Sequence, residues 1–380
     1  MKRVLIVGIG PFGIVLAREL SRIKELKIEM IDQRDHIAGN CFTQRDSETN
    51  VMLHVYGPHI FNTNHSDVWE YVKSYSEMVP FCNRVKAVTP KGVFSLPVNL
   101  LTLNQFFGKN LNPVQAKKFV KRLGCKEIKT PKNFQEAALK AVGLDLYENF
   151  FQGYTIKQWG VDPKCLPPDV FKRLPLRFNY DDSYYNTKFQ GIPRHGYTAL
   201  YENILNSAKV RTQLKVSYHQ EMIEKYDHIF YSGSIDKFYN YRFGNLNYRT
   251  VYFKKQNILG DVLGNAVINY TDLKYPYTRK HEHKHFTPWE NHAKTTVFTE
   301  FSKKTEGADE PYYPVRSKED IFKLEQYNAL ALKTPNISFV GRLGFYRYLD
   351  MDQIIGTALD LAYKIDKTKS LKSVVIPRNK

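Results

Sequence analysis

The chain of 380 residues has few cysteines and no long apolar run. Its four cysteines, Cys41, Cys82, Cys125 and Cys165, are far apart and form no CxxC pair. Neither a disulfide framework nor a zinc site is therefore expected, and the thiols should be reduced. No stretch reaches the roughly 18 apolar residues of a membrane span, and the first apolar run breaks at glycines too early for a signal peptide. We expect a soluble, cytoplasmic protein.

Runs of basic residues are also lacking, although 56 Lys and Arg outnumber 38 Asp and Glu and give a formal net charge of +18. Such a charge favours a polyanionic partner: nucleic acid, a membrane surface or a phosphorylated small molecule. Because the basic residues are spread along the chain, we expect a phosphorylated ligand, with no nucleic acid and no stable membrane insertion. Excess lysine that serves only solubility explains most of them equally well. Aromatic residues make up 14%, which suits stacking on a base or ring.

The N-terminal sequence predicts a βαβ unit. Two apolar runs, Arg3–Val7 and Ile28–Ile31, flank a glycine-rich turn and a helical pattern. The turn fits GxGxxG with Gly8, Gly10 and Gly13, which permit a tight turn, close approach of a pyrophosphate, and helix–strand packing. Asp32 closes the second run, where a carboxylate accepts a hydrogen bond from a ribose hydroxyl and favours FAD or NAD over NADP.

The rest of the chain predicts two insertions into this nucleotide-binding unit. Residues from about 99 to 172 have helical spacing, whereas those from 248 to about 301 form short β-branched and aromatic stretches typical of antiparallel strands. Asn336–Gly341 then predicts a strand and Asp352–Tyr363 a helix. The predicted fold class is α/β, with a split Rossmann-like domain, an inserted helical domain and an antiparallel β-sheet domain.

One segment, His281–His285, matches HExxH literally. A zinc protease needs this motif on a helix, so that both histidines share a face. Pro276 before it and Pro288 after it favour a strand instead, on which the three histidines would face one side and Glu282 the other. A polar sheet face is therefore expected, and no metal site.

Eight longer stretches carry a family resemblance. They are IDQRDHIAGN at 31–40, HVYGPHIF at 54–61, GYTIKQWG at 153–160, KRLPLRFNYDD at 172–182, YDHIFYSG at 226–233, PYTR at 276–279, EPYYPV at 310–315 and FVGRLGFYRYLDMD at 339–352. Over nearly its whole length the chain resembles bacterial UDP-galactopyranose mutases, flavoenzymes that interconvert the pyranose and furanose forms of UDP-galactose.

The resemblance implies a homodimer of three-domain subunits. The FAD-binding α/β domain would comprise residues 1–80, about 190–245 and about 318–380. A helical domain with a mobile substrate loop would span about 99–189, and the antiparallel sheet domain about 81–98 and 246–317.

The resemblance also implies the site residues. FAD would contact Gly8, Gly10, Phe12, Gly13, Asp32, Gln33, Gly39, Asn40, Gly57, Pro58, His59, Arg342, Leu349, Asp350 and Met351. The UDP-sugar would contact Asn83, Phe150, Phe151, Tyr154, Thr155, Trp159, Arg173, Tyr184, Arg249, Asn269, Arg279, Tyr313 and Tyr348. Arg173 and Arg279, which would grip the diphosphate, and His59 would form the catalytic set, with no metal.

The mechanism implied by the resemblance needs reduced FAD. Flavin N5 attacks the anomeric carbon and displaces UDP, and the sugar recloses with the other ring size, for use in galactofuranose-containing surface glycans. Because the nucleophile belongs to the cofactor, no catalytic triad or carboxylate pair is expected.

Three departures from the family pattern and three alternatives accompany this hypothesis. Pro11 and Ala38 replace small residues or glycine, and Asn62 stands where many relatives have histidine. Asparagine there could admit the acetamido group of UDP-N-acetylgalactosamine, or merely pack against the flavin. An FAD-dependent oxidoreductase would share the N-terminal fingerprint, and a nucleotide-sugar sensor would bind without catalysis.

Overall fold

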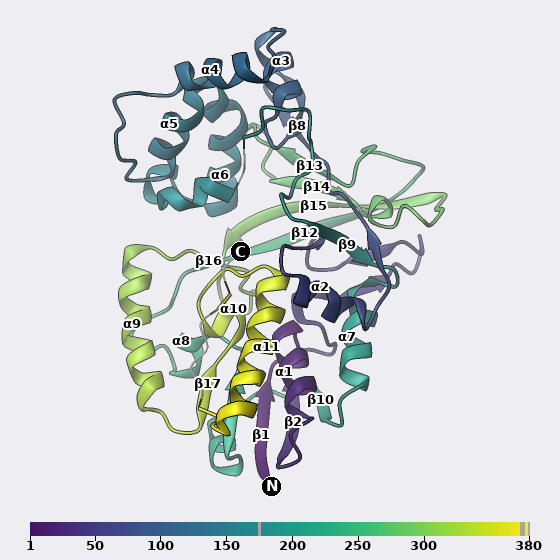
Figure 1. The fold of residues 1–380 in the computed structure, drawn as a ribbon, viewed down its shortest axis with the longest axis vertical. Coiled ribbons are helices and arrows are strands. Elements are labelled where there is room, and N and C mark those ends of the chain that lie inside the picture. Colours follow the sequence, from purple (N-terminus) through teal and green to yellow (C-terminus); the bar gives the residue numbers. More distant parts are fainter. Residues whose placement is uncertain (174–175, 373–376, 379–380) are drawn as a thin grey trace.

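Residues 1–173, 176–372 and 377–378 are described by a computed structural model, which contains a parallel five-stranded sheet in its lower half (Figure 1). The strand order is β10-β2-β1-β11-β17, and every neighbouring pair is parallel. The strands are β1 (Lys2–Val7), β2 (Leu26–Asp32), β10 (Arg211–Leu214), β11 (His228–Tyr231) and β17 (Ile337–Phe339). The predicted N-terminal βαβ unit and the late strand are thus confirmed.

Different helices cover the two faces of this sheet. Val4 and Ile6 of β1 pack in one core with α1 (Pro11–Leu20), α7 (Gly196–Asn206) and α11 (Met351–Thr368). Leu5, which points the other way because side chains alternate along a strand, packs in a second core with α8 (Ile235–Phe238) and η5 (Gln220–Lys225). The helix predicted over 352–363 is therefore α11, which runs one residue earlier and five later.

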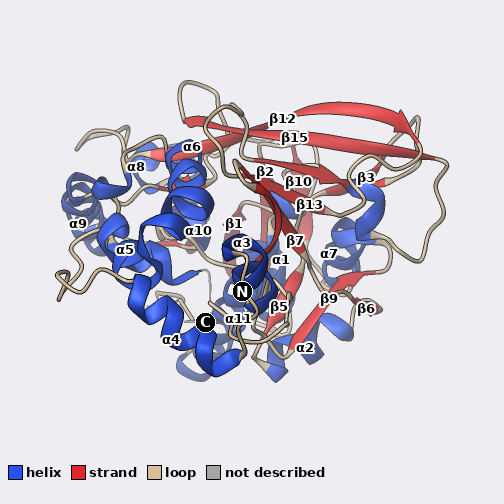
Figure 2. Ribbon diagram, turned by 90° about the horizontal axis from the view of Figure 1, so that it is seen from above, coloured by secondary structure: helices blue, strands red, loops and turns tan. Residues whose placement is uncertain are grey.

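The large sheet has seven strands in the order β16-β12-β15-β14-β13-β7-β8. Its members are β7 (Val85–Thr89), β8 (Gly92–Leu96), β12 (Tyr248–Leu259), β13 (Val267–Tyr270), β14 (Arg279–Glu282), β15 (Lys294–Lys304) and β16 (Tyr313–Pro314). Figure 2 shows the long strands β12 and β15 side by side. The sheet is antiparallel as predicted except that β13 and β7 are parallel. These two strands come from distant parts of the chain, so no hairpin fixes their relative direction.

The helical lobe, defined as α3 to α6, lies above the large sheet (Figure 1). It contains α3 (Leu100–Phe107), α4 (Pro113–Leu123), α5 (Phe134–Leu146), η2 (Tyr147–Gln152) and α6 (Gly153–Trp159). Asparagine side chains cap the first three: Asn99, Asn112 and Asn133 each accept from a backbone amide in the first turn. Local capping therefore explains why this segment is helical.

The remaining elements connect these layers. They are η1 (Gly39–Cys41), β3 (Thr43–Arg45), β4 (Met52–His54), β5 (Phe61–Thr63), α2 (Ser66–Lys73), β6 (Met78–Pro80), η3 (Pro163–Cys165), η4 (Pro168–Arg173), β9 (Phe189–Pro193), η6 (His283–Phe286), α9 (Lys318–Lys333) and α10 (Gly341–Gly344). Among the described residues, no helix is both long enough and apolar enough to cross a bilayer. The exact domain boundaries stay a prediction.

Candidate active site

A single cavity of about 1630 Å³ opens at the carboxyl ends of the parallel strands. The helical lobe contributes Tyr154 to its wall, the large sheet contributes Arg279, and the glycine-rich turn contributes Gly8 and Gly10. Ligands of open α/β sheets bind at this edge. Sites for one small ligand usually measure about 300–1,000 Å³, so this cavity has room for a dinucleotide together with a second ligand.

The glycine-rich turn forms a cradle that side chains would fill. Gly8 has a φ of +104°, and a Cβ there would lie 1.9 Å from the Ser232 Oγ. A Cβ on Gly13 would lie 2.1 Å from the carbonyl oxygen of Gly8. Glycine at both positions therefore lets α1 start directly against β1, with its N-terminal amides toward the cavity, as a dinucleotide pyrophosphate requires.

Asp32 ties this turn to the end of β2. Its Oδ2 accepts from the amide of Ile9 at 2.7 Å, and its Oδ1 accepts from the amide of Arg34 at 2.9 Å. The Arg34 guanidinium is itself paired with Glu310 at 2.7 Å and donates to the Oδ1 of Asn40. Since Arg34 is already neutralised, this end of the cavity suits a ribose hydroxyl better than a 2′-phosphate.

His59 lies half-buried in the cavity wall in the neutral state. Its Nδ1 is 2.8 Å from the carbonyl oxygen of Gly57, and because a carbonyl only accepts, Nδ1 carries the proton and Nε2 is left as an acceptor. Burial, together with the nearby positive charge of Arg342, lowers the pKa of His59 to about 4. This imidazole therefore accepts a hydrogen bond near neutral pH and does not donate a proton as an acid.

Arg279 is held by a buried carboxylate. Its Nε donates to the Oε2 of Glu300 at 2.8 Å, while the hydroxyl of Thr278 donates to the other oxygen, Oε1, at 2.9 Å. Burial opposes the charge, but Glu300 outweighs it and the pKa of Arg279 is raised well above its usual value. Among the described residues no other partner of this guanidinium is found, so its two terminal nitrogens are available to an anion.

A second arginine, Arg342, faces the same cavity between two tyrosines. Its Cζ lies 4.7 Å from the ring centroid of Tyr348 and 5.8 Å from that of Tyr313. Its Nε is buried without a hydrogen-bond partner in the described part of the chain. An unpaired buried donor is costly, so the residue fits an anionic or carbonyl-bearing ligand that supplies the acceptor.

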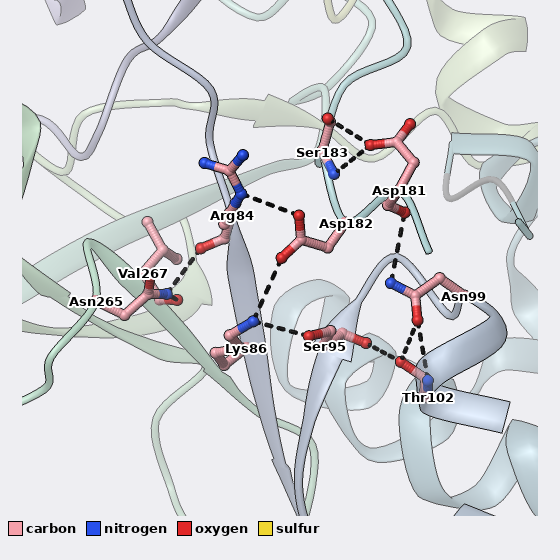
Figure 3. Close-up of polar contacts among 10 residues, drawn as sticks. All are labelled: Arg84, Lys86, Ser95, Asn99, Thr102, Asp181, Asp182, Ser183, Asn265 and Val267. Atoms are coloured by element: carbon pink, nitrogen blue, oxygen red, sulfur yellow. Dashed lines mark hydrogen bonds and ion pairs between the residues drawn. The ribbon is translucent and has the colours of Figure 1, made fainter. Parts of the chain in front are cut away.

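The segment that carries Tyr184 is anchored by ion pairs to the large sheet (Figure 3). Asp182 bridges two basic residues of the first part of that sheet, with its Oδ1 3.0 Å from Arg84 Nε and its Oδ2 3.6 Å from Lys86 Nζ. The amide of Tyr184 then donates to the carbonyl oxygen of Asn83 at 2.8 Å. These contacts fix Tyr184 at the cavity wall.

Two family models match this chain. The family model for UDP-galactopyranose mutase matches residues 149–348, and that for NAD(P)-binding Rossmann-like domains matches residues 6–75. The chain belongs to the UDP-galactopyranose mutase family. Family membership makes the protein an isomerase of the intramolecular transferase type.

Two relatives align over nearly the whole mutase chain. A probable UDP-galactopyranose mutase of Klebsiella pneumoniae is 49% identical over 361 residues, which cover 95% of this chain and 94% of that protein. A dTDP-fucopyranose mutase of Escherichia coli is 46% identical over 369 residues, covering 95% and 98%. A crystal structure of reduced UDP-galactopyranose mutase has the same fold, with a TM-score of 0.73 at 14% identity over 97% of this chain and 94% of that one.

Most residues expected in the mutase site line the cavity. They are Gly8, Gly10, Phe12, Gly13, Asp32, Gln33, Gly39, Asn40, Gly57, Pro58, His59, Phe150, Phe151, Tyr154, Thr155, Trp159, Tyr184, Arg279, Tyr313, Arg342, Tyr348, Leu349, Asp350 and Met351. Arg173 ends η4, but its side chain lies outside the described part of the structure.

Three expected substrate residues, Asn83, Arg249 and Asn269, are buried outside the described lining. Arg249 joins the large sheet to α6, since its Nε donates to the carbonyl oxygen of Gln158 at 3.1 Å. A Cβ on Gly160 would lie 2.3 Å from the Arg249 Nη1, so glycine at 160 makes room for this contact. The Oδ1 atoms of Asn83 and Asn269 have no partner among the described residues.

The HExxH segment differs from the polar strand face that the sequence predicts. β14 ends at Glu282, and η6 begins at His283, because the Glu282 carboxylate accepts from the amides of Val262 and Leu263 and so fixes the turn. His281 and His283 are fully buried, whereas His285 is half-buried. The three histidines therefore do not share one face.

His285 forms a charge cluster outside the cavity. Its Nε2 lies 3.1 Å from Asp261 Oδ2 and 3.6 Å from Glu282 Oε2. Hydrogen bonds to Glu282 and Asp261 raise the pKa of His285, so the two carboxylates favour the protonated imidazole. Ion pairing accounts for this cluster.

Glu300 and Arg34 were not predicted as site residues from the sequence. Glu300 lies in the otherwise apolar and β-branched stretch of β15 and is only 1% exposed. A lone acid in such a strand is a signal of a buried, paired carboxylate. Arg34 gives no comparable signal, because it follows Asp32 in a polar segment.

Proposed function

We propose that this protein interconverts the pyranose and furanose forms of a UDP-hexose, with FAD bound in the turn Gly8–Gly13 and active only when reduced. The single observation that carries the proposal is Arg279, which lines the cavity that also contains the glycine cradle and, among the described residues, pairs only through its Nε, with Glu300. An anion-binding guanidinium and a dinucleotide cradle in one cavity suit a nucleotide-sugar held against a flavin.

The chemical fit of FAD rests on three features of the chain. The cradle formed by Gly8 and Gly13 leaves room for a pyrophosphate, Asp32 offers a carboxylate at the ribose position, and the Nε of Arg342 lacks an acceptor. When bound and reduced, the flavin supplies the nucleophile for the anomeric carbon.

The residues of this chain position the reactants. Arg279, fixed by Glu300, holds the diphosphate as it leaves and keeps it in place for return, and Arg173 shares this role. The neutral His59 accepts a hydrogen bond through Nε2 beside the ring system. Tyr184, Tyr313 and Tyr348 wall the sugar end and exclude water. Positioning and charge stabilisation of this kind carry most of the catalytic effect when a cofactor supplies the nucleophile.

Asn62 sets the sugar preference within this proposal. It lines the cavity, its Nδ2 donates to the carbonyl oxygen of Ile60 at 3.3 Å, and its Oδ1 is buried without a partner in the described residues. That free acceptor supports activity on UDP-galactose with acceptance of UDP-N-acetylgalactosamine, whose amide N–H it would bind.

The deciding assay is chromatography of nucleotide-sugars after incubation with dithionite-reduced protein. UDP-galactopyranose, UDP-N-acetylgalactosamine and dTDP-fucopyranose serve as parallel substrates, since one relative carries the last name. Formation of the furanose form only under reducing conditions supports the proposal. Oxidation of an amine or alcohol without a nucleotide-sugar would identify an oxidoreductase, and tight binding without conversion a sensor.

We further propose a cytoplasmic homodimer that supplies UDP-galactofuranose for surface glycans. The support is the family membership. Sedimentation of the purified protein tests the dimer, and fractionation of cells tests the location.

A further inference from the structure

A second hollow lies in the helical lobe, outside the large cavity. It measures about 510 Å³ and is lined by Lys121, Gly124, Cys125, Lys126, Ile128, Lys129 and Lys140. Four of these seven side chains are lysines, and none of the seven lines the large cavity. The hollow is therefore separate from the cavity in which we propose that isomerisation takes place.

The surface around this hollow concentrates the positive charge of the protein. Residues 109–140 contain nine basic and two acidic residues, so this segment carries +7 of the net charge of +18. The basic residues are spaced so that the sequence shows no run, but α4 gathers Lys117, Lys118, Lys121 and Arg122 on its exposed side while Ala116 and Val120 are buried. The even spread of charge that the sequence indicates is therefore wrong for the folded protein.

These side chains are exposed and not neutralised by the protein. We define the basic face as Lys117, Lys118, Lys121 and Arg122 of α4 with Lys126, Lys129 and Lys132 of the following loop, and all seven are exposed. Within the described residues, none of them forms a salt bridge. Mutual repulsion on such a face is relieved when an anionic partner binds.

We propose that the basic face docks reversibly on an anionic lipid surface, with the lysine-lined hollow receiving a phosphate-bearing headgroup. Clusters of four to eight basic residues on an amphipathic helix are typical of such docking. Val114 is 64% exposed and lies three, four and seven residues before Lys117, Lys118 and Lys121, so an apolar side chain shares their face. α4 also lies at the outer end of the molecule, away from the parallel sheet (Figure 1).

Two features favour lipid over nucleic acid as the occupant. Six of the seven charges are lysines, which act as point charges, whereas recognition of nucleic-acid phosphates favours the guanidinium fork. Among the described residues 109–146 no aromatic side chain is exposed for base stacking, and Phe119 is half-buried with Lys109 Nζ 5.3 Å from its ring centroid.

The test is flotation of the complete protein with vesicles of phosphatidylcholine alone or with phosphatidylglycerol. We expect binding to the anionic vesicles only, with release when salt is raised from about 0.1 to 0.5 M, because the Debye length shortens. The patch variant replaces Lys117, Lys118, Lys121 and Arg122 by glutamine. It should weaken partitioning on the order of a thousandfold while turnover of soluble substrate stays unchanged.

A matched control removes the same charge elsewhere. Replacing Lys24, Lys27, Lys209 and Arg211 by glutamine also removes three lysines and one arginine. All four are exposed and lie in or within two residues of β2 and β10, strands at the opposite end of the molecule from α4 (Figure 1). Vesicle binding should survive in this control. Equal loss in both variants would assign binding to net charge and overturn the proposal. Binding of a single-stranded RNA without binding of vesicles would also overturn it. If sodium phosphate released the protein from vesicles more than sodium chloride of equal ionic strength, the hollow would take free phosphate, and the proposal would be overturned as well.

Discussion

The Nε of Arg279 donates to the buried Oε2 of Glu300 over 2.8 Å, on neighbouring strands where the two residues are directly paired. This bond holds the guanidinium of a residue that lines the cavity and leaves its terminal nitrogens without a partner in the described part of the chain. In the proposed function, Glu300 would thus act on the diphosphate through Arg279, as a positioning residue.

Replacing Glu300 by Gln should therefore lower turnover without removing the cofactor. The amide is nearly isosteric but loses the charge that orients Arg279, and losing one charged hydrogen bond costs about 1.5–3 kcal/mol, roughly 10- to 150-fold in kcat/KM. Steady-state kinetics and flavin absorbance are the measurements. Glu325→Gln, at an exposed position of α9, is the control and should leave both unchanged; equal kinetics in the two variants would contradict the positioning role.

Removing either arginine that we assign to the diphosphate should abolish most activity. Arg279→Ala leaves a departing diphosphate without its cation, a loss of roughly 2–5 kcal/mol, and Arg173→Ala should behave similarly. The flavin spectrum should stay intact, because both residues are assigned to the substrate. Near-normal turnover of Arg279→Ala would refute the assignment, and partial rescue by Arg279→Lys would support a role for charge.

The two glycines of the cradle should fail in different ways. A Cβ on Gly10 meets only the Gly39 Cα at 3.8 Å, an ordinary contact, whereas a Cβ on Gly13 would overlap the Gly8 carbonyl oxygen at 2.1 Å. Gly10→Ala should therefore keep the thermal midpoint of the apoprotein and lose flavin affinity, while Gly13→Ala should lower the midpoint itself. Thermal unfolding and flavin titration distinguish the two. Identical thermal midpoints of the two variants would show that α1 can move away from β1 at little cost when residue 13 gains a Cβ.

Acid should destabilise the protein through its buried histidines. Burial lowers the pKa of His59 to about 4 and that of His283 to about 3, and it lowers the pKa of His54 and His281 well below the usual 6.5. The unfolded chain therefore binds more protons below pH 6.5, so this stability is present above pH 6.5 and is lost as pH falls toward 4. For His59 and His283, protonation of the unfolded chain lowers the free energy of unfolding by about 2 kcal/mol each between pH 7 and pH 5.

Urea unfolding between pH 5 and 7 measures this slope. This slope is proportional to the number of protons taken up on unfolding, and His283→Gln should lower that number by about one. His219→Gln, at an exposed position, should leave it unchanged. A free energy of unfolding that is flat over this range would show that these histidines already titrate in the folded protein.

Asn62→His tests the sugar preference. We expect the variant to lose turnover of the acetamido sugar and to keep turnover of UDP-galactose. The imidazole is larger than the amide and removes the unpaired Oδ1 that would accept from the acetamido N–H. Competition between the two UDP-sugars at equal concentration is the measurement. Unchanged discrimination after the substitution would mean that Asn62 only packs in the wall.

Local sequence patterns were sufficient to predict the nucleotide-binding unit. Features that depend on contacts between distant segments could not be predicted in this way. GxGxxG with Asp32 is sufficient because its strand, turn and helix are consecutive. By contrast, the strand at His281 ends where Glu282 meets the amides of Val262 and Leu263, which no pattern near the motif reveals.

The basic face and the contacts of Arg249 could not be predicted either, because both depend on how the chain folds. The basic face arises because helical spacing brings separated lysines together, so a search for runs overlooks it. Arg249 was expected at the substrate, but α6 lies close enough for Gln158 to accept its hydrogen bond. The family resemblance supplied that residue, and only the three-dimensional packing shows what it touches.

The position of β1 also constrains the order in which the protein can assemble. β1 lies between β2 and β11, and Val4 pairs with His228, with β17 added at Ile337–Phe339. During synthesis the first strand emerges long before its second neighbour exists, while the α-helices between them can form from local contacts. The parallel sheet is thus completed last, and a ribosome-bound chain that stops before residue 228 leaves an open, apolar edge on β1 for chaperones or aggregation.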